Sequence, residues 1–309
     1  MKSFGRKWRV TISSDNGSQW VIPDKPEDGL KLHCVFRVEK FMLTQAFWAE
    51  VSMYNLNMPT QTRLIEEGDF VVIEAGYEEG PYEQLFSGSV FQPMFERENV
   101  TDYKTTLYCM DGLGLLTANI SNVTLQSGYD YRSVISAMAA SAHKAIPLGS
   151  ITSNLDSKSS PRGKTIFGEP NKYIRQLEQD NNAIGFVSDG KLNIAKIDDE
   201  CSQEALVITP TTGLVGTPQQ TQYGVNFRCL LNPSITITSP PMVVKLDQTV
   251  VRQMKARPGQ YLTPLDKDGF YKVIGVVYTG DTRGNSWYVD VSGVNLAGKV
   301  SALFPHYSR

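Results

Sequence analysis

The chain has 309 residues, a length that predicts two or three domains with a substantial core. Its 30 Lys and Arg residues nearly balance its 32 Asp and Glu residues, and the resulting net charge of -2 excludes the broad basic surface that general nucleic-acid binding requires. Apolar residues make up 41% of the chain, so we expect it to fold rather than to remain disordered.

No targeting or membrane segment is predicted. The first ten residues carry four cations, but no apolar stretch long enough for a signal peptide follows them. No later run approaches the 18 or so apolar residues that a membrane-spanning helix needs. We therefore expect a protein that is made and kept in a cytoplasm.

The N-terminal third alternates polar and apolar residues with a period of two. Its runs are rich in Val, Ile, Thr and aromatic residues and are bounded by turn-forming residues, which is typical of strands joined by turns. Short antiparallel strands with few helices between them predict a small barrel or sandwich. The runs are Leu32 to Lys40, Phe47 to Leu56, Asp69 to Tyr77, Gln84 to Phe91 and Tyr103 to Gly112.

The middle third predicts a compact α+β module. Apolar residues recur at helical spacing from Tyr131 to Ala145, and a second helix is predicted from Pro170 to Asn181. The pair Asp189-Gly190 lies between two strand-like runs, which is a strong hairpin signal. Between the helices, the polar segment from Ser150 to Lys164 predicts an exposed loop.

From about Leu206 the strand pattern returns and predicts a second β domain. Its prolines are expected at the ends of strands, where a missing amide donor does least harm. The prolines are Pro210, Pro218, Pro233, Pro240 and Pro241. The runs are Ala205 to Gly216, Gly224 to Pro233, Ser234 to Leu246, Gly269 to Asp281 and Asn285 to Val294.

The two β regions resemble each other in layout. In the first, a VVIE strand precedes a strand with LFSGSV, a turn with Thr101-Asp102 and the strand KTTLYCM. In the second, a VVKL strand precedes FYKVIGVV, the turn GDTRGN and the strand SWYVDVSGV. We infer that one barrel plan is used twice.

No constellation of residues predicts catalysis, a cofactor or a metal ion. The three histidines, His33, His143 and His306, lack the paired spacing of metal ligands, and no GxSxG nucleophile elbow is present. DGLGLL lacks the third glycine of a dinucleotide fingerprint, and SSPRGK lacks the glycine spacing of a phosphate loop. The acidic run Asp198 to Glu200 is predicted to be a solvated turn.

The four cysteines, at positions 34, 109, 201 and 229, show no CxxC spacing. Cys34 and Cys109 lie in strand-like runs between apolar residues, and we expect both to be buried free thiols.

The order of these motifs resembles the phage tail baseplate hub family, specifically its tube-like double-barrel, late-control-protein-D-like members. LHCVFRVEK, AEVSMYNLN, GDFVVIEAGY, LFSGSV and LYCMDG follow the first tube-like barrel of that family. GVNFRCLLNPSITI is similar to its Leu-Leu-Asn-Pro segment, and the run from Tyr271 to Gly293 is similar to its closing hairpin. The resemblance extends from about Phe36 to Asn295.

The resemblance implies a mainly β fold with an α+β insert, in which two tube-like antiparallel β-barrels flank the small module. The expected domains are residues 1–116, 117–204 and 205–309. It further implies a homotrimer whose six barrels match a hexameric tail tube on one side and a threefold central spike, a separate protein, on the other. Tape measure and baseplate wedge proteins are further expected partners, and DNA is expected to pass through the lumen without specific binding.

The resemblance also implies assembly in the host cytoplasm, a place in the tail baseplate of the virion and no enzymatic activity. Interface roles are expected for one loop, one tryptophan and one Asn-Pro pair. These residues are Gly280, Asp281, Thr282, Arg283, Gly284, Asn285, Trp287, Asn232 and Pro233.

Two other functions remain open at this stage. A receptor- or glycan-binding tail protein would need an exposed aromatic groove, for which Trp8, Trp20 and Trp48 are the candidates. A cell-wall hydrolase would need paired carboxylates in a cleft. The candidates for that pair are Glu66, Glu67, Glu78, Glu79 and Glu83.

Overall fold

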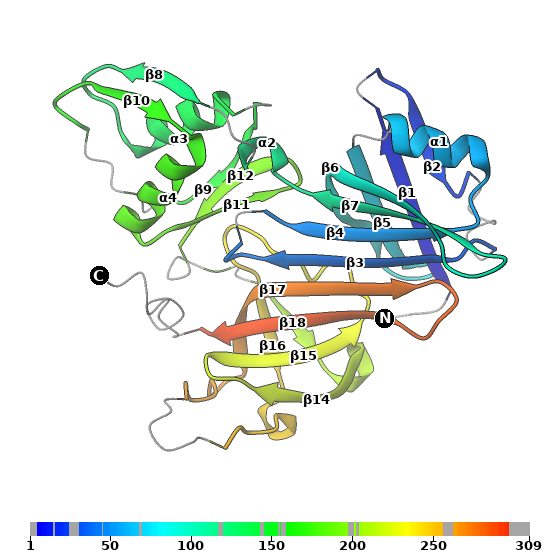
Figure 1. Cartoon of the computed structure of the whole chain (residues 1–309). Coiled ribbons are helices and arrows are strands. Elements are labelled where there is room, and N and C mark those ends of the chain that lie inside the picture. The colour runs from blue at the N-terminus through cyan, green and yellow to red at the C-terminus, as the bar shows by residue number, and fades with distance from the viewer. Residues whose placement is uncertain are drawn as a thin grey trace.

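The computed structural model describes residues 5–14, 16–24, 31–44, 46–67, 70–116, 120–142, 145–153, 155, 159–196, 201, 204–255 and 262–296. Strands from both ends of the chain form one 13-stranded sheet, and the middle of the chain forms a separate α+β module beside it (Figure 1). The mainly β fold with an α+β insert is therefore confirmed.

The first β region contains seven strands and one helix. The strands alternate buried and exposed residues, so that one face of the sheet packs on the core. The elements are β1 (Arg6–Ser13), β2 (Gln19–Ile22), β3 (Cys34–Phe41), β4 (Trp48–Tyr54), α1 (Met58–Glu67), β5 (Phe70–Tyr77), β6 (Tyr82–Arg97) and β7 (Tyr103–Met110).

The middle module packs helices against short strands around its own core, which includes Ile135, Met138, Ile174 and Ile194. Asp130 caps the first long helix by accepting a hydrogen bond from Ser133 N. The elements are α2 (Leu113–Leu116), β8 (Ser121–Leu125), α3 (Tyr131–Ala140), β9 (Leu148–Ile151), β10 (Lys164–Gly168), α4 (Pro170–Asn181), β11 (Ile184–Ser188) and β12 (Lys191–Ala195).

The second β region contains six strands and two short 3-10 helices. They are β13 (Ala205–Ile208), η2 (Pro210–Thr212), β14 (Leu214–Gln220), β15 (Gly224–Leu230), β16 (Val243–Leu246), η3 (Gln248–Val250), β17 (Phe270–Asp281) and β18 (Trp287–Asn295).

The two β regions are joined by strand pairing. Residues 275–281 of β17 pair antiparallel with residues 35–41 of β3, and one hydrophobic core extends beneath both regions. No pairing among the described strands closes either region into a complete ring of hydrogen bonds. Two separate barrels, and the division after residues 116 and 204, therefore stay predictions.

Three expectations about elements need correction. The predicted helix from Tyr131 to Ala145 is shorter, because its last turn ends at Ser141, whose amide and hydroxyl both bond to Ala137 O. Most of the predicted strand from Ser234 to Leu246 is irregular, because two consecutive prolines there remove amide donors. Pro218 lies inside β14, where the pairing with β15 shifts register.

The module contacts the first β region through the tip of the β11–β12 hairpin. Asp189 and Gly190 adopt positive φ angles at this tip, as the Asp-Gly pair predicted. The Gln84 amide donates to Asp189 Oδ1 over 2.8 Å, and Gly190 N donates to Asp111 Oδ1 over 3.2 Å. Phe186 of the hairpin stacks on Phe47 with ring centroids 5.8 Å apart. The contact is therefore both polar and apolar.

Asp111 carries an unusual charge environment at this contact. Burial raises its pKa to about 6, and the neighbouring Asp189 adds to the effect, while the Gly190 amide and the Lys40 ammonium oppose it. Lys40 is itself buried, which lowers its pKa, and its amine lies over the Phe47 ring. The joint between module and sheet thus contains a buried group of charges.

Candidate assembly interface

The two β regions share one strand order. Across the sheet the order is β3-β4-β7-β6-β5-β1 in the first region and β14-β15-β18-β17-β16-β13 in the second. Each strand of the first set has a counterpart at the same place in both the chain order and the sheet order. One pairing differs, since β1 is antiparallel to β5 whereas β13 is parallel to β16. The internal repeat expected from the sequence is present as a duplicated connectivity of six strands.

The registers of the two sets agree as well. The pairing of β6 with β7 is interrupted by a bulge at Phe91, and the pairing of β17 with β18 by a bulge at Ile274. Since 274 minus 91 is 183, each residue after the bulge in β6 corresponds to the residue numbered 183 higher in β17. The partners Cys109 and Gly293 then give an offset of 184 between β7 and β18.

Loop hydrogen bonds confirm this correspondence independently. The offset makes Tyr103 equivalent to Trp287. The carbonyl of Tyr103 accepts from Asn55 N over 2.9 Å, and the carbonyl of Trp287 accepts from Leu231 N over 3.0 Å. The same hydrogen bond is thus made at the same place in each repeat.

The junction between the repeats is formed by the outermost strand of the first repeat, β3, and the fourth strand of the second, β17. Two aromatic residues of the second repeat are buried there: Tyr278 is 0% exposed and Trp287 is 2% exposed. Phe36 of β3 packs edge-on against Trp287, with ring centroids 5.4 Å apart. The indole nitrogen of Trp287 donates to Gly76 O over 3.3 Å. Trp287 therefore contacts both β3 and β5 of the first repeat.

The predicted loop from Gly280 to Asn285 lies at this junction and connects the repeats within the chain. Asp281 Oδ1 accepts hydrogen bonds from the amides of Arg283 and Gly284, over 2.9 and 2.7 Å, and lies 3.0 Å from His33 Nε2. Burial alone would raise the pKa of Asp281, but these amides and His33 lower it below its usual value. The loop is thus an ordered turn.

The first repeat holds this loop from two sides. Arg6 Nη1 donates to the carbonyls of Asp281 and Gly284 over 2.7 and 2.6 Å, and its guanidinium lies over the Trp287 ring. Thr282 Oγ1 donates to Leu32 O over 3.0 Å.

The other predicted interface residues differ in exposure. Within the loop, Arg283 and Asn285 are exposed, and a Arg283 guanidinium nitrogen donates to Lys31 O over 2.6 Å. Gly280 approaches Phe36 so closely that a Cβ would lie 2.1 Å from the ring. Asn232 and Pro233 are buried directly after Leu231, whose amide donates to Trp287 O. Contact of any of these residues with another protein stays a prediction.

A second place equivalent to this junction is open. It is the outer edge of β6 from Phe91 to Arg97, which we call the open β6 edge. Phe95 and Tyr103, the equivalents of Tyr278 and Trp287, stack on each other at 5.7 Å but are 43% and 40% exposed. No described strand pairs with this edge. The sequence pattern gave no sign of it, because the predicted strand stopped at Phe91, before Pro93.

The sheet face opposite the core carries ion pairs in both repeats. Arg37 bonds to Glu39, and Arg228 forms two hydrogen bonds to Asp290 on the neighbouring strand. These exposed ion pairs contribute little to stability. They do neutralise two cations that would otherwise attract a phosphate backbone.

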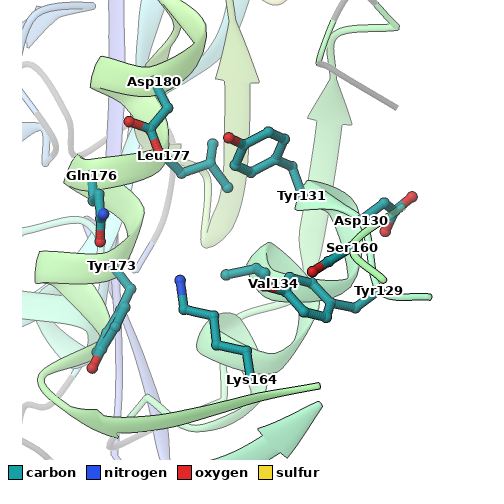
Figure 2. A pocket seen from close by; sticks show the side chains of 10 residues that line it. All are labelled: Tyr129, Asp130, Tyr131, Val134, Ser160, Lys164, Tyr173, Gln176, Leu177 and Asp180. Atoms are coloured by element: carbon teal, nitrogen blue, oxygen red, sulfur yellow. The ribbon is translucent and has the colours of Figure 1, made fainter. Parts of the chain in front are cut away.

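The middle module contains a half-open cavity of about 270 Å³ between α3, α4 and β10. Figure 2 shows the Lys164 amine pointing into it between Tyr173 and Val134. Asp130 is already engaged with Ser133. The lining residues include neither histidine nor cysteine: they are Tyr129, Asp130, Tyr131, Val134, Ser160, Lys164, Tyr173, Gln176, Leu177 and Asp180.

The described residues assemble none of the other candidate sites. Trp8 is buried in the core and Trp48 stacks on Tyr108, so these two do not form an exposed groove with Trp20. Glu78, Glu79 and Glu83 are exposed around the β5–β6 turn. The side chains of Glu66 and Glu67, the residues His143 and His306 and the run Asp198 to Glu200 lie outside the described residues.

Cys34 and Cys109 are buried free thiols, as expected, and the described residues contain no group of His, Cys, Asp and Glu that could hold a metal ion. None of the described helices is long and apolar enough to cross a membrane.

The fold matches those of solved tail proteins. The prophage MuSo2 43 kDa tail protein from Shewanella oneidensis aligns with a TM-score of 0.58 at 9% identity, over 93% of this chain and 98% of its own. A tail protein from Neisseria meningitidis MC58 aligns with a TM-score of 0.57 at 8% identity, over 94% and 97%. The E. coli c3393 protein, a component of the type VI secretion system with structural similarity to T4 bacteriophage tail proteins gp27 and gp5, aligns with a TM-score of 0.53 at 9% identity, over 85% and 73%.

The duplicated strand plan thus has the fold of solved tail proteins. The model of the baseplate hub gp41 family matches residues 9–246, which is most of the chain, and the chain belongs to this family. Its location is thus the tail baseplate of the virion. The comparison with curated proteins gives no significant match.

Proposed function

We propose that this baseplate hub protein is a trimeric symmetry adapter, which joins the hexameric tail tube to the threefold central spike. A trimer can present six similar surfaces only when each chain supplies two. The observation that carries the proposal is the duplicated strand order, with the same bulge at Phe91 and at Ile274.

The packing between the repeats supports a ring. The two repeats are joined head to tail, with β3 of one against β17 of the other, rather than through equivalent surfaces. A head-to-tail contact leaves one surface of each kind unpaired at the two ends. Repeated contacts of this kind close into a ring when the rotation between neighbouring repeats is a whole fraction of a full turn. Three chains then make a ring of six repeats.

The proposed partners are compatible with this geometry. One side of the ring receives the tube protein and the other the spike, while tape measure and wedge proteins contact the same assembly. The sheet face that carries the ion pairs Arg37–Glu39 and Arg228–Asp290 suits a lumen through which DNA passes without specific binding, because its arginines are already paired with carboxylates. In this proposal the protein is not an enzyme and acts through its surfaces.

The test is the mass of the purified protein and its binding to tube protein. One chain has a mass of 34.4 kDa, so sedimentation should show a species of three times 34.4, about 103 kDa. Electron microscopy should show threefold particles with a central hole, and purified tube protein should bind them. A monomer at every concentration, with no tube binding, would refute the proposal.

A further inference from the structure

The open β6 edge and the corresponding edge of β17 are equivalent surfaces of the two repeats, and only the β17 edge is covered by another strand. Beyond its bulge, β17 is covered by β3, and Tyr278 is 0% exposed. The equivalent Phe95 of β6 is 43% exposed, although it projects from the core side of the sheet, like its partner Thr105. An aromatic residue exposed on the core side of an unpaired edge marks a place for another strand.

The chain also carries the strand that fits there. The repeat makes β14 the counterpart of β3, and β14 lies at the end of the 13-stranded sheet. The chain's own β14 is separated from its β6 by the six strands between them in the sheet order, so the strand that reaches the open edge comes from a second copy.

We infer that the open β6 edge of one copy pairs antiparallel with β14 of a second copy, in the register of the β3–β17 junction. This inference rests on the proposed function and supplies the contact that closes the ring. The occupant is a second copy of this chain, because β3 already covers the equivalent surface of β17 within one chain.

The register follows from the equivalences. In the first repeat, Arg37 pairs with Glu50, which pairs with Tyr108. In the second, Gln219 pairs with Asn226, which pairs with Ser292. Tyr108 and Ser292 are equivalent, because their numbers differ by the offset of 184. Gln219 is therefore the counterpart of Arg37. Because Arg37 pairs with Thr279, and 279 minus 183 is 96, Gln219 of one copy should lie opposite Glu96 of the next.

Pro93 agrees with this register. Its equivalent in β17 is Val276, which pairs with Lys40 of β3. The counterpart of Lys40 would lie two residues beyond the end of β14 at Gln220, so no strand residue is expected opposite Pro93. The missing amide of Pro93 therefore costs the new junction nothing, and it prevents longer pairing with other chains.

A short segment now covers part of β14 and has to give way. We call Arg252–Met254 the strap. Arg252 N donates to Pro218 O over 2.8 Å, and Arg252 O accepts from Gln220 N over 2.9 Å. Met254 N donates to Gln220 Oε1 over 3.1 Å. The strap thus occupies the backbone hydrogen-bonding groups of β14 that β6 of the next copy would use. When the strap leaves, β6 of the next copy would supply hydrogen bonds of the same kind to these groups.

Disulfide formation between copies tests the register. Glu96 and Gln219 are both exposed, so the double variant Glu96→Cys/Gln219→Cys is expected to fold and to give covalent trimers on oxidation in non-reducing electrophoresis. Arg37→Cys/Thr279→Cys is the matched positive control, because its pair lies within one chain and should close without a change in mass. Met94→Cys/Gln219→Cys, shifted by two residues on the same face, is the negative control.

The outcomes separate this inference from the proposed function. Trimers by sedimentation that give no Glu96–Gln219 cross-link, or that cross-link through Met94 instead, overturn the strand pairing and leave the hub function standing. A protein that stays monomeric overturns both.

The strap is tested by its hydrogen bonds. Arg252→Pro removes the amide that donates to Pro218 O, and the milder Gln220→Ala removes the side-chain acceptor of Met254 N. Both should raise the rate of Glu96–Gln219 cross-linking several-fold at a fixed protein concentration, and Gln220→Ala serves where the proline variant does not fold. An unchanged or slower rate in the folded variants overturns the role of the strap.

Discussion

His33 Nε2 lies 3.0 Å from Asp281 Oδ1, which links the residue before β3 in the first repeat to the β17–β18 turn in the second. The two residues are 248 positions apart in the chain. Their contact, together with the strand pairing beside it, makes two similar halves into one sheet.

Replacing Asp281 by Ala should destabilise the protein by about 1–3 kcal/mol, because two amides and His33 lose their shared acceptor. Urea denaturation measures this change. Asp290→Ala removes a carboxylate from an exposed pair and should cost less than about 1 kcal/mol. Equal losses for the two variants would contradict the structural role of Asp281.

The close approach of Gly280 to Phe36 predicts a second effect. Gly280→Ala places a methyl group 2.1 Å from the ring and should cost about 1–3 kcal/mol through overpacking. In a Phe36→Leu background the same substitution should cost less, because the side chain in contact is smaller. A double-mutant cycle by denaturation detects the difference, and strictly additive costs would argue against the contact.

Stability should depend on pH through Asp111. Its pKa is raised to about 6 by burial, so the folded chain holds this proton more tightly than the unfolded chain does. Folding stability from this group is therefore lost as the pH rises from about 4 to about 6. Asp111→Asn removes this pH-dependent loss. The free energy of unfolding of the variant, minus that of the parent protein, should therefore increase by on the order of 2 kcal/mol between about pH 4 and about pH 6. Thermal melts at several pH values check this, and a constant difference would count against it.

The contact of the middle module depends on Phe186. Phe186→Ala should cost about 3–5 kcal/mol, because this ring is 1% exposed and stacks on Phe47. Phe167→Ala changes the same residue type at a site that is 66% exposed, and should change stability by less than about 0.5 kcal/mol. Calorimetry on the two variants compares them directly.

Local patterns were enough to predict much of the fold. The helix from Pro170 to Asn181 begins and ends at the predicted residues, because a proline suits its first turn and its apolar residues share one face. The hairpin at Asp189-Gly190 was likewise predicted from its turn residues. Such features depend on residues that are close together in the sequence, so one sequence is enough to predict them.

The parts that escaped prediction depend on distant contacts or on broken patterns. Nothing in the residues of β3 and β17 specifies that these strands pair with each other, because any two apolar, alternating strands satisfy the same rule. β6 continues past Pro93 because its outer edge needs no amide there, whereas a proline usually ends a strand pattern. The N-terminal strand β1 buries Trp8, Val10 and Ile12. Its alternating pattern is present in the sequence, but the strand was not predicted because the segment is also rich in cations.

Prediction of the interface is limited in the same way, because it depends on contacts between distant parts of the chain. The loop from Gly280 to Asn285 was chosen from its likeness to a family motif, and the structure shows what it does within one chain. The open β6 edge has no motif and is recognised only by comparing equivalent residues of the two repeats.

The covalent link between the repeats also bears on how quickly a ring could form. In a ring of six repeats, three of the six joints are the β3–β17 contact, which forms inside each chain at a rate that does not depend on protein concentration. Two encounters between molecules would then bring the three chains together, where six separate subunits would need five. The duplicated chain thus makes closed rings accessible at low subunit concentration and leaves fewer partly assembled arcs with exposed strand edges.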